Sequence, residues 1–195
     1  MRRHAPWRLG CREFLGATMS IFDFSMTPEQ AAAFLASNQL TSRNAVDLAM
    51  AWLEAGSDSV AVASLAIEDR DYVSWKDISV RFREALNDLG AGNLSDEQCV
   101  LFRTQCILQK FLARDIAGLD FCYVIQSAWP SSEDGVVGSP PISVDRLQLL
   151  GREFDSTAHG DPAAQQRLDA VANELRDEAL RVLAEIDARL QVKST

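Results

Sequence analysis

Apolar residues recur at helical spacing along most of this sequence, and this pattern favours an all-α fold. The longest run follows Asp161-Pro162, a pair that is typical of a helix start. It predicts one C-terminal helix of about thirty residues. Steps of three and four residues separate its apolar positions, which are Leu168, Val171, Leu175, Ala179, Val182, Ile186 and Leu190. This spacing is close to the pitch of a straight α-helix, so we expect a helix that lies across a bundle rather than one strand of a coiled coil.

Start and stop signals divide the rest of the chain into further helices. Thr27–Gln30 and Ser95–Gln98 match the capping box, in which the first and fourth residues each bond the backbone N–H of the other. Gly56 and Gly90 follow two of the predicted helices, where a left-handed residue commonly ends a helix. Further helix starts are predicted at Thr41 or Ser42, at Ser74 and at Ser143.

Two predicted helices are notably apolar. Apolar side chains cover more than half the circumference of 96–117, so we expect this helix to be central and packed on two sides. The β-branched residues of 58–68 would suit a strand, but their spacing favours a short buried helix. The chain is therefore predicted to be a compact array of about seven or eight helices with a long C-terminal helix and no significant β-sheet.

The predicted helices belong to one domain with four parts. Residues 1–19 are basic and lack helical periodicity, so we interpret them as a non-native or disordered extension, with a natural start at Met19. Residues 20–129 are the predicted helical core. Residues 130–142 hold the prolines, glycines and serines of an exposed loop. Residues 143–195 are predicted to pack on the core as the C-terminal helices.

The chain is acidic, with a formal net charge of −9. Its basic N-terminal extension makes the remaining residues more acidic than this figure. Such a chain repels phosphate backbones and anionic lipid, so we expect neither a nucleic acid nor a membrane as partner. No apolar run approaches the roughly 18–20 residues of a membrane span. We therefore expect a cytoplasmic protein whose four cysteines (11, 99, 106 and 122) are free thiols.

The sequence offers little to a catalytic or metal site. Only two histidines occur, His4 in the extension and His159 at a helix junction. Histidine is the commonest general base and a frequent metal ligand. Metal-ligand spacings, a nucleophile elbow and glycine-rich phosphate loops are all missing from the sequence. We therefore assign no catalytic, cofactor-binding or metal-binding residue and expect no cofactor.

Acidity, helicity and the missing catalytic groups favour a non-enzymatic bacterial module that binds a basic protein. An immunity protein, an antitoxin-like protein or an adaptor fits this description. Acidic side chains in two segments are the predicted partner contacts: Glu68, Asp69, Asp71, Glu133 and Asp134.

Two alternatives use other features of the chain. A ligand-binding or hydrolytic protein would hold its pocket beside helix 96–117, lined by the aromatic side chains of Trp75, Phe102, Phe121 and Trp129. A homo-oligomeric scaffold would form through the C-terminal helix as a homodimer. Aromatic residues at helical spacing are more often core than pocket, and a long helix more often covers its own bundle.

Overall fold

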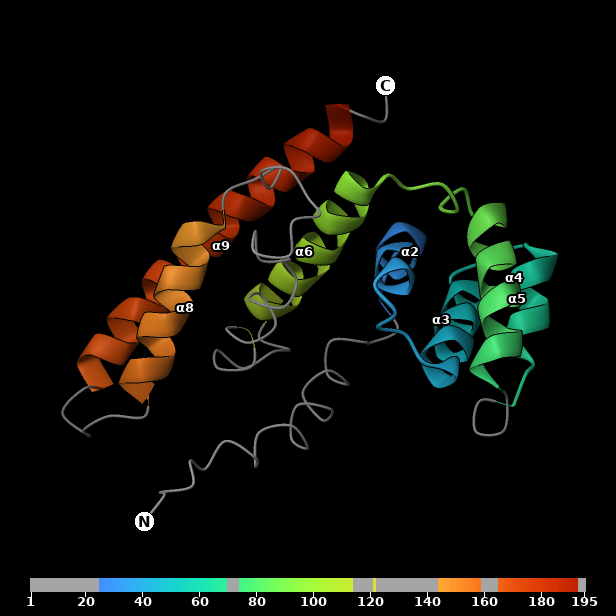
Figure 1. Ribbon diagram of the computed structural model, residues 1–195, viewed down its shortest axis with the longest axis horizontal. Helices are drawn as coiled ribbons and strands as arrows, with labels where there is room; N and C mark the ends of the chain where they lie inside the picture. The colour runs from blue at the N-terminus through green and yellow to red at the C-terminus, as the bar shows by residue number, and fades with distance from the viewer. Residues whose placement is uncertain (1–24, 70–73, 114–120, 122–143, 159–164, 193–195) are drawn as a thin grey trace, which may run out of the picture.

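A computed structural model describes residues 25–69, 74–113, 121, 144–158 and 165–192 of the chain. In these residues it contains seven α-helices and no strand (Figure 1). The helices are α2 (Pro28–Ala36), α3 (Ser42–Glu54), α4 (Val60–Ala66), α5 (Trp75–Asp88), α6 (Asp96–Ala113), α8 (Asp145–Ala158) and α9 (Gln165–Val192). The predicted all-α fold and its long C-terminal helix are confirmed.

The helix termini follow the predicted capping signals. In the box at α2, Thr27 Oγ1 accepts a hydrogen bond from Gln30 N at 3.3 Å and Gln30 Oε1 accepts one from Thr27 N at 3.2 Å. The box at α6 joins Ser95 and Gln98 in the same way, at 3.2 and 2.9 Å. Gly90 has a φ of +78° just after α5, as the stop signal predicted. These local bonds satisfy backbone groups that each helix end would otherwise leave without partners.

The helices pack as a row in which α6 is central. Helix α8 packs on α9, α9 on α6, and α6 on α2, while α3, α4 and α5 pack together next to α2. Figure 1 shows the two ends of this row, with α8 and α9 at one and α3 to α5 at the other. The prediction that α6 packs on two sides is confirmed, since α2 and α9 both contact it.

Aromatic side chains hold the α3–α5 end together. Trp52 of α3 stacks on Phe82 of α5, with ring centroids 5.8 Å apart and planes 11° from parallel. The indole Nε1 of Trp52 donates to the carbonyl of Met26 at 3.0 Å, so this buried donor is satisfied. The short helix α4, predicted over 58–68, is present and buries Val62 and Leu65.

A ladder of polar side chains crosses the middle of the row. Gln30 of α2 donates through Nε2 to Gln105 Oε1 (3.2 Å) and Gln109 Oε1 (3.0 Å), both on α6. Gln105 in turn donates through Nε2 to Asp187 Oδ1 of α9 at 2.7 Å. Because Gln30 is only 3% exposed, its amide needs these partners, and they fix the register of three helices.

Apolar contacts of α9 match the predicted stripe. Its central positions Val171, Leu175, Ala179, Val182 and Ile186 are all buried. The stripe therefore serves packing within the chain, against α6 and α8. A homodimer through α9, which stays a prediction, would have to use its remaining face.

Several sequence predictions lie outside the described residues. These are the N-terminal extension 1–19, the loop 130–142, the helix starts at Ser143 and Asp161, and His159. The proposed four-part domain division is accordingly not tested.

Candidate functional site

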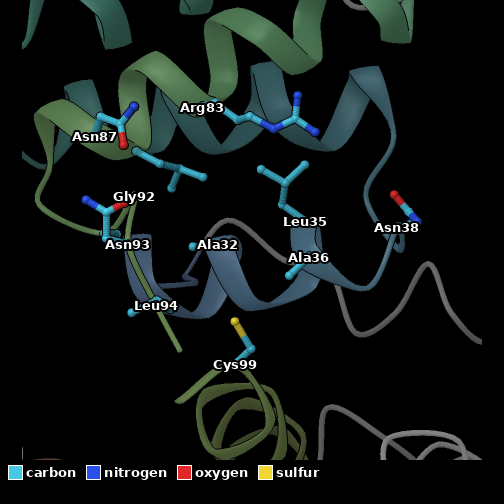
Figure 2. Close-up of a pocket in the computed structure, with 12 residues that line it drawn as sticks. Ala32, Leu35, Ala36, Asn38, Arg83, Asn87, Gly92, Asn93, Leu94 and Cys99 are labelled. Carbon is cyan, nitrogen blue, oxygen red and sulfur yellow. The ribbon is translucent and has the colours of Figure 1, made fainter. Parts of the chain in front are cut away.

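A cavity of about 420 Å³ lies between α2, α5 and the start of α6. Figure 2 shows it from the side, with the arginine and asparagines around its rim and the cysteine opposite Arg83. The size falls within the roughly 300–1,000 Å³ of small-molecule sites. Its walls are Ala32, Leu35, Ala36, Asn38, Arg83, Leu86, Asn87, Ala91, Gly92, Asn93, Leu94 and Cys99.

Helix α5 contributes a charged and a polar side chain to one wall of the cavity. Arg83 and Asn87 are four residues apart, so they lie on the same side of α5 and both line the cavity. Arg83 is exposed and makes no hydrogen bond or ion pair with another described residue. By contrast, Arg81, two positions earlier on α5, is in an ion pair with Glu68. The guanidinium of Arg83 is thus available to a ligand.

Turn geometry places the other polar groups. Asn38 follows the C-terminus of α2 with a left-handed φ of +54°, a conformation that asparagine tolerates better than most residues. Gly90 turns the chain out of α5 into the segment 91–94, which forms one wall. A Cβ on Gly92 would lie 1.5 Å from Asn87 Oδ1, so the absence of a side chain at Gly92 lets Asn87 pack there.

The thiol of Cys99 is not set up as a nucleophile. Burial raises its pKa, the negative charge of Asp96 raises it further, and Arg103 opposes the shift. A reactive cysteine needs the thiolate, which positive surroundings favour and these do not. Cys99 therefore lines the cavity as a protonated, weakly polar group. Cys106, seven residues further along α6, is buried and, like Cys99, is in no disulfide.

A smaller cavity of about 140 Å³ lies beside the polar ladder. Gln30, Cys106 and Gln109 are among its lining residues. Its volume is below the usual range of ligand sites. We assign it to the packing of α2 on α6.

An acidic edge is the second surface feature; we use this name for Glu54, Asp58, Glu84 and Asp88. Ser59, the N-cap of α4, donates through Oγ to Asp88 Oδ2 at 2.8 Å and so joins the start of α4 to the end of α5. Asp58 directly precedes Ser59, and Glu54, the last residue of α3, is four residues before Asp58. Glu84 lies one turn before Asp88 on α5. All four are exposed, and none is in an ion pair with another described residue.

Of the acidic residues predicted as partner contacts, the structure describes Glu68 and Asp69, and neither is part of the acidic edge. Glu68 follows the C-terminus of α4, where the ion pair with Arg81 compensates its charge. Asp69 beside it is exposed. Asp71, Glu133 and Asp134 lie outside the described residues.

Of the aromatic residues predicted to line a pocket, Trp75, Phe102 and Phe121 are described, and none of them lines the 420 Å³ cavity. Phe121 is fully buried and stacks on Phe111 with centroids 4.0 Å apart, which makes it core. Trp75 packs partly buried against the same core. Phe102 is half-buried on α6, and Trp129 is outside the described residues.

The cavity and the acidic edge could not be picked out from the sequence. Arg83–Asn87 and Glu84–Asp88 are i,i+4 pairs, and this spacing was the only available signal. The groups that face them come partly from residues about 30 to 50 positions earlier and, for the cavity, also from 91–99, and helix packing brings them close.

The described part of the chain also lacks metal-binding and membrane-spanning features. No group of three or more histidine, cysteine, aspartate or glutamate side chains there is arranged to hold a metal ion. Nor does any of its helices combine the length and apolarity that crossing a membrane requires. Comparison of the chain with protein families, curated proteins and solved structures found no match.

Proposed function

We propose that this chain is a non-enzymatic, cytoplasmic bacterial module that binds a basic protein, as an immunity, antitoxin-like or adaptor protein does. The observation that carries the proposal is the acidic edge. Its four exposed carboxylates have no compensating cation among the described residues, although the chain contains 19 lysines and arginines. Closely placed like charges repel one another, and a basic partner relieves that repulsion on binding.

The position of the edge suits an interface. The edge lies where the ends of α3 and α5 come near the start of α4, and the Ser59–Asp88 hydrogen bond joins α4 to α5 there. Preorganised charges need little reordering on association, and complementary charge accelerates encounter. The overall charge of −9 acts in the same direction over longer range.

A charge-neutralised bait tests this proposal. The full chain is used as wild type, as the double variant Glu54→Gln/Asp58→Asn, and as the control Asp169→Asn/Asp177→Asn. The control removes the same charge from exposed positions of α9. Each bait is incubated with lysate of the natural host, and the retained basic protein is then purified for affinity measurement.

Wild type and control should retain the same basic protein, and the edge variant should bind it about tenfold more weakly. Binding should also weaken as salt is raised from 0.05 to about 0.5 M, because salt screens exposed charges. Equal retention by all three baits would show that the edge carries no partner specificity and would overturn the proposal. Retention of no basic protein by wild type would do the same.

A further inference from the structure

The 420 Å³ cavity combines one available cation with three asparagine amides and a group of leucine and alanine side chains, and this combination defines a ligand chemistry. We propose that it binds a small amphipathic monocarboxylate. Arg83 would bind the carboxylate while the alkyl group packs on the leucines of α2 and α5. This site is separate from the acidic edge and does not depend on the protein partner.

The charge of the ligand follows from the lining. Among the described residues that line the cavity, Arg83 is the only ionisable side chain apart from the protonated thiol of Cys99. Its guanidinium has a planar fork of donors that matches one carboxylate in a bidentate pair. The remaining polar groups are the neutral amides of Asn38, Asn87 and Asn93, which supply both donors and acceptors.

A single negative charge fits better than a phosphate dianion. A second charge would find no further cation among the described lining residues, in a chain whose net charge is already −9. At the nearby N-terminus of α6, Ser95 Oγ already accepts from the amide of Gln98, and the first turn carries the negative charges of Asp96 and Glu97, which disfavour a second charge on the ligand. The neutral thiol of Cys99 also avoids repelling an anion, which a thiolate would do.

The apolar part of the ligand is defined by side chains from three elements. Leu35 and Ala36 come from α2, Leu86 from α5, and Leu94 from the segment before α6. Figure 2 shows Leu35 between Arg83 and the side of the cavity formed by Ala36. Packing of a branched alkyl group against these residues removes apolar surface from water and so favours binding. A short branched chain suits this half-open site better than a long one.

The site is tested with 4-methylpentanoate as probe and its neutral amide, 4-methylpentanamide, as the matched ligand. Each is titrated into the ¹⁵N-labelled full chain at pH 7 and followed by amide chemical shifts. The protein variants are Arg83→Gln and the control Arg152→Gln. Arg152 is an exposed arginine of α8 that likewise has no partner among the described residues and does not line the cavity.

The acid should bind wild type and Arg152→Gln with a Kd of about 1 mM or lower. Shifts should concentrate in 35–38, 83–87 and 91–94. Loss of the charged pair should weaken binding about tenfold or more, both in Arg83→Gln and for the amide on wild type. No saturable shifts up to 20 mM acid, or equal binding by Arg83→Gln, would overturn the proposal.

Alkylation of Cys99 locates the bound probe independently. Saturating 4-methylpentanoate should slow the reaction of Cys99 with N-ethylmaleimide at least threefold, measured on the peptide that contains it by mass spectrometry. Ala36→Trp places a large side chain in the cavity from an exposed position and should abolish both the binding and the protection. Binding that leaves the Cys99 rate unchanged would place the probe elsewhere and refute the assignment.

Discussion

Removal of the hydrogen bond between Gln105 and Asp187 should measure how strongly the polar ladder holds α9 on α6. The two side chains come from positions 82 residues apart in the chain and meet at 2.7 Å. A double-mutant cycle with Gln105→Ala and Asp187→Ala isolates this contact. Gln105 also accepts from Gln30, but that loss occurs on both sides of the cycle and cancels.

The length of the Gln105–Asp187 hydrogen bond and the burial of its two side chains set the expected coupling free energy. At 2.7 Å the bond is at the short, charge-assisted end of the N–H···O⁻ range, where a hydrogen bond contributes about 1.5–3 kcal/mol net. Both side chains are half-buried, so solvent reduces this figure. We expect a coupling free energy of about 1–2 kcal/mol. The surface pair Arg189–Glu185, at 3.4 Å, serves as the control and should couple by no more than about 0.5 kcal/mol.

Urea denaturation followed by circular dichroism gives the free energy of unfolding for each variant. All four proteins in each cycle are compared at the same pH and salt. A Gln105–Asp187 coupling no larger than that of the surface pair would refute the reasoning, because the ladder would then add register without stability.

Three further predictions concern the helix ends, the core and the cavity. Phe82→Ala removes a fully buried ring that stacks on Trp52, so it should lower the free energy of unfolding by about 3–5 kcal/mol. The control Val80→Ala, at a 54% exposed position, should lower it by less than about 0.5 kcal/mol in the same urea titration. Similar losses in the two variants would contradict the assigned core. Gly90→Ala should lower the free energy of unfolding by about 1 kcal/mol because of the left-handed φ alone, since a Cβ there meets nothing within 4 Å. Gly90→Asn should lower it less, because asparagine tolerates this conformation better. The reverse order of stability in thermal melts would count against backbone strain as the cause. Because burial raises the pKa of the Cys99 thiol, the unfolded chain loses the thiol proton at a lower pH than the folded chain does. The contribution of Cys99 to stability should therefore be complete below the ordinary pKa range of thiols and should fall as pH rises through that range. A Cys99→Val variant that shows the same loss of stability would assign the loss to other groups.

The helices themselves were readable from the sequence because their signals are local. Thr27 and Gln30 make their bonds within one turn, and Gly90 adopts its positive φ as its lack of a Cβ allows. The apolar stripe from Val171 to Ile186 predicted which side of α9 is buried, because helical geometry alone places those residues together.

The role of the aromatic residues could not be predicted from local patterns in the sequence. Periodicity marked Phe121 as apolar and helical, but it did not say whether that ring lines a pocket or fills the core. Its stack on Phe111 answers this in favour of the core. The sequence likewise did not show which acidic residues form ion pairs. Glu68 pairs with Arg81 of α5, whereas Glu54 and Asp58 form no ion pair with a described residue.

The sequence by itself determined that this chain is acidic and helical, where most helices begin and end, and which face of each is apolar. Only the tertiary structure decided which helices meet. That decision placed Arg83 opposite Leu35 and Cys99 around one cavity and joined Ser59 to Asp88 beside the acidic edge. The physical reason is that caps and periodicity act within a few residues, whereas a cavity or a charged edge depends on the packing of side chains from helices distant in the chain.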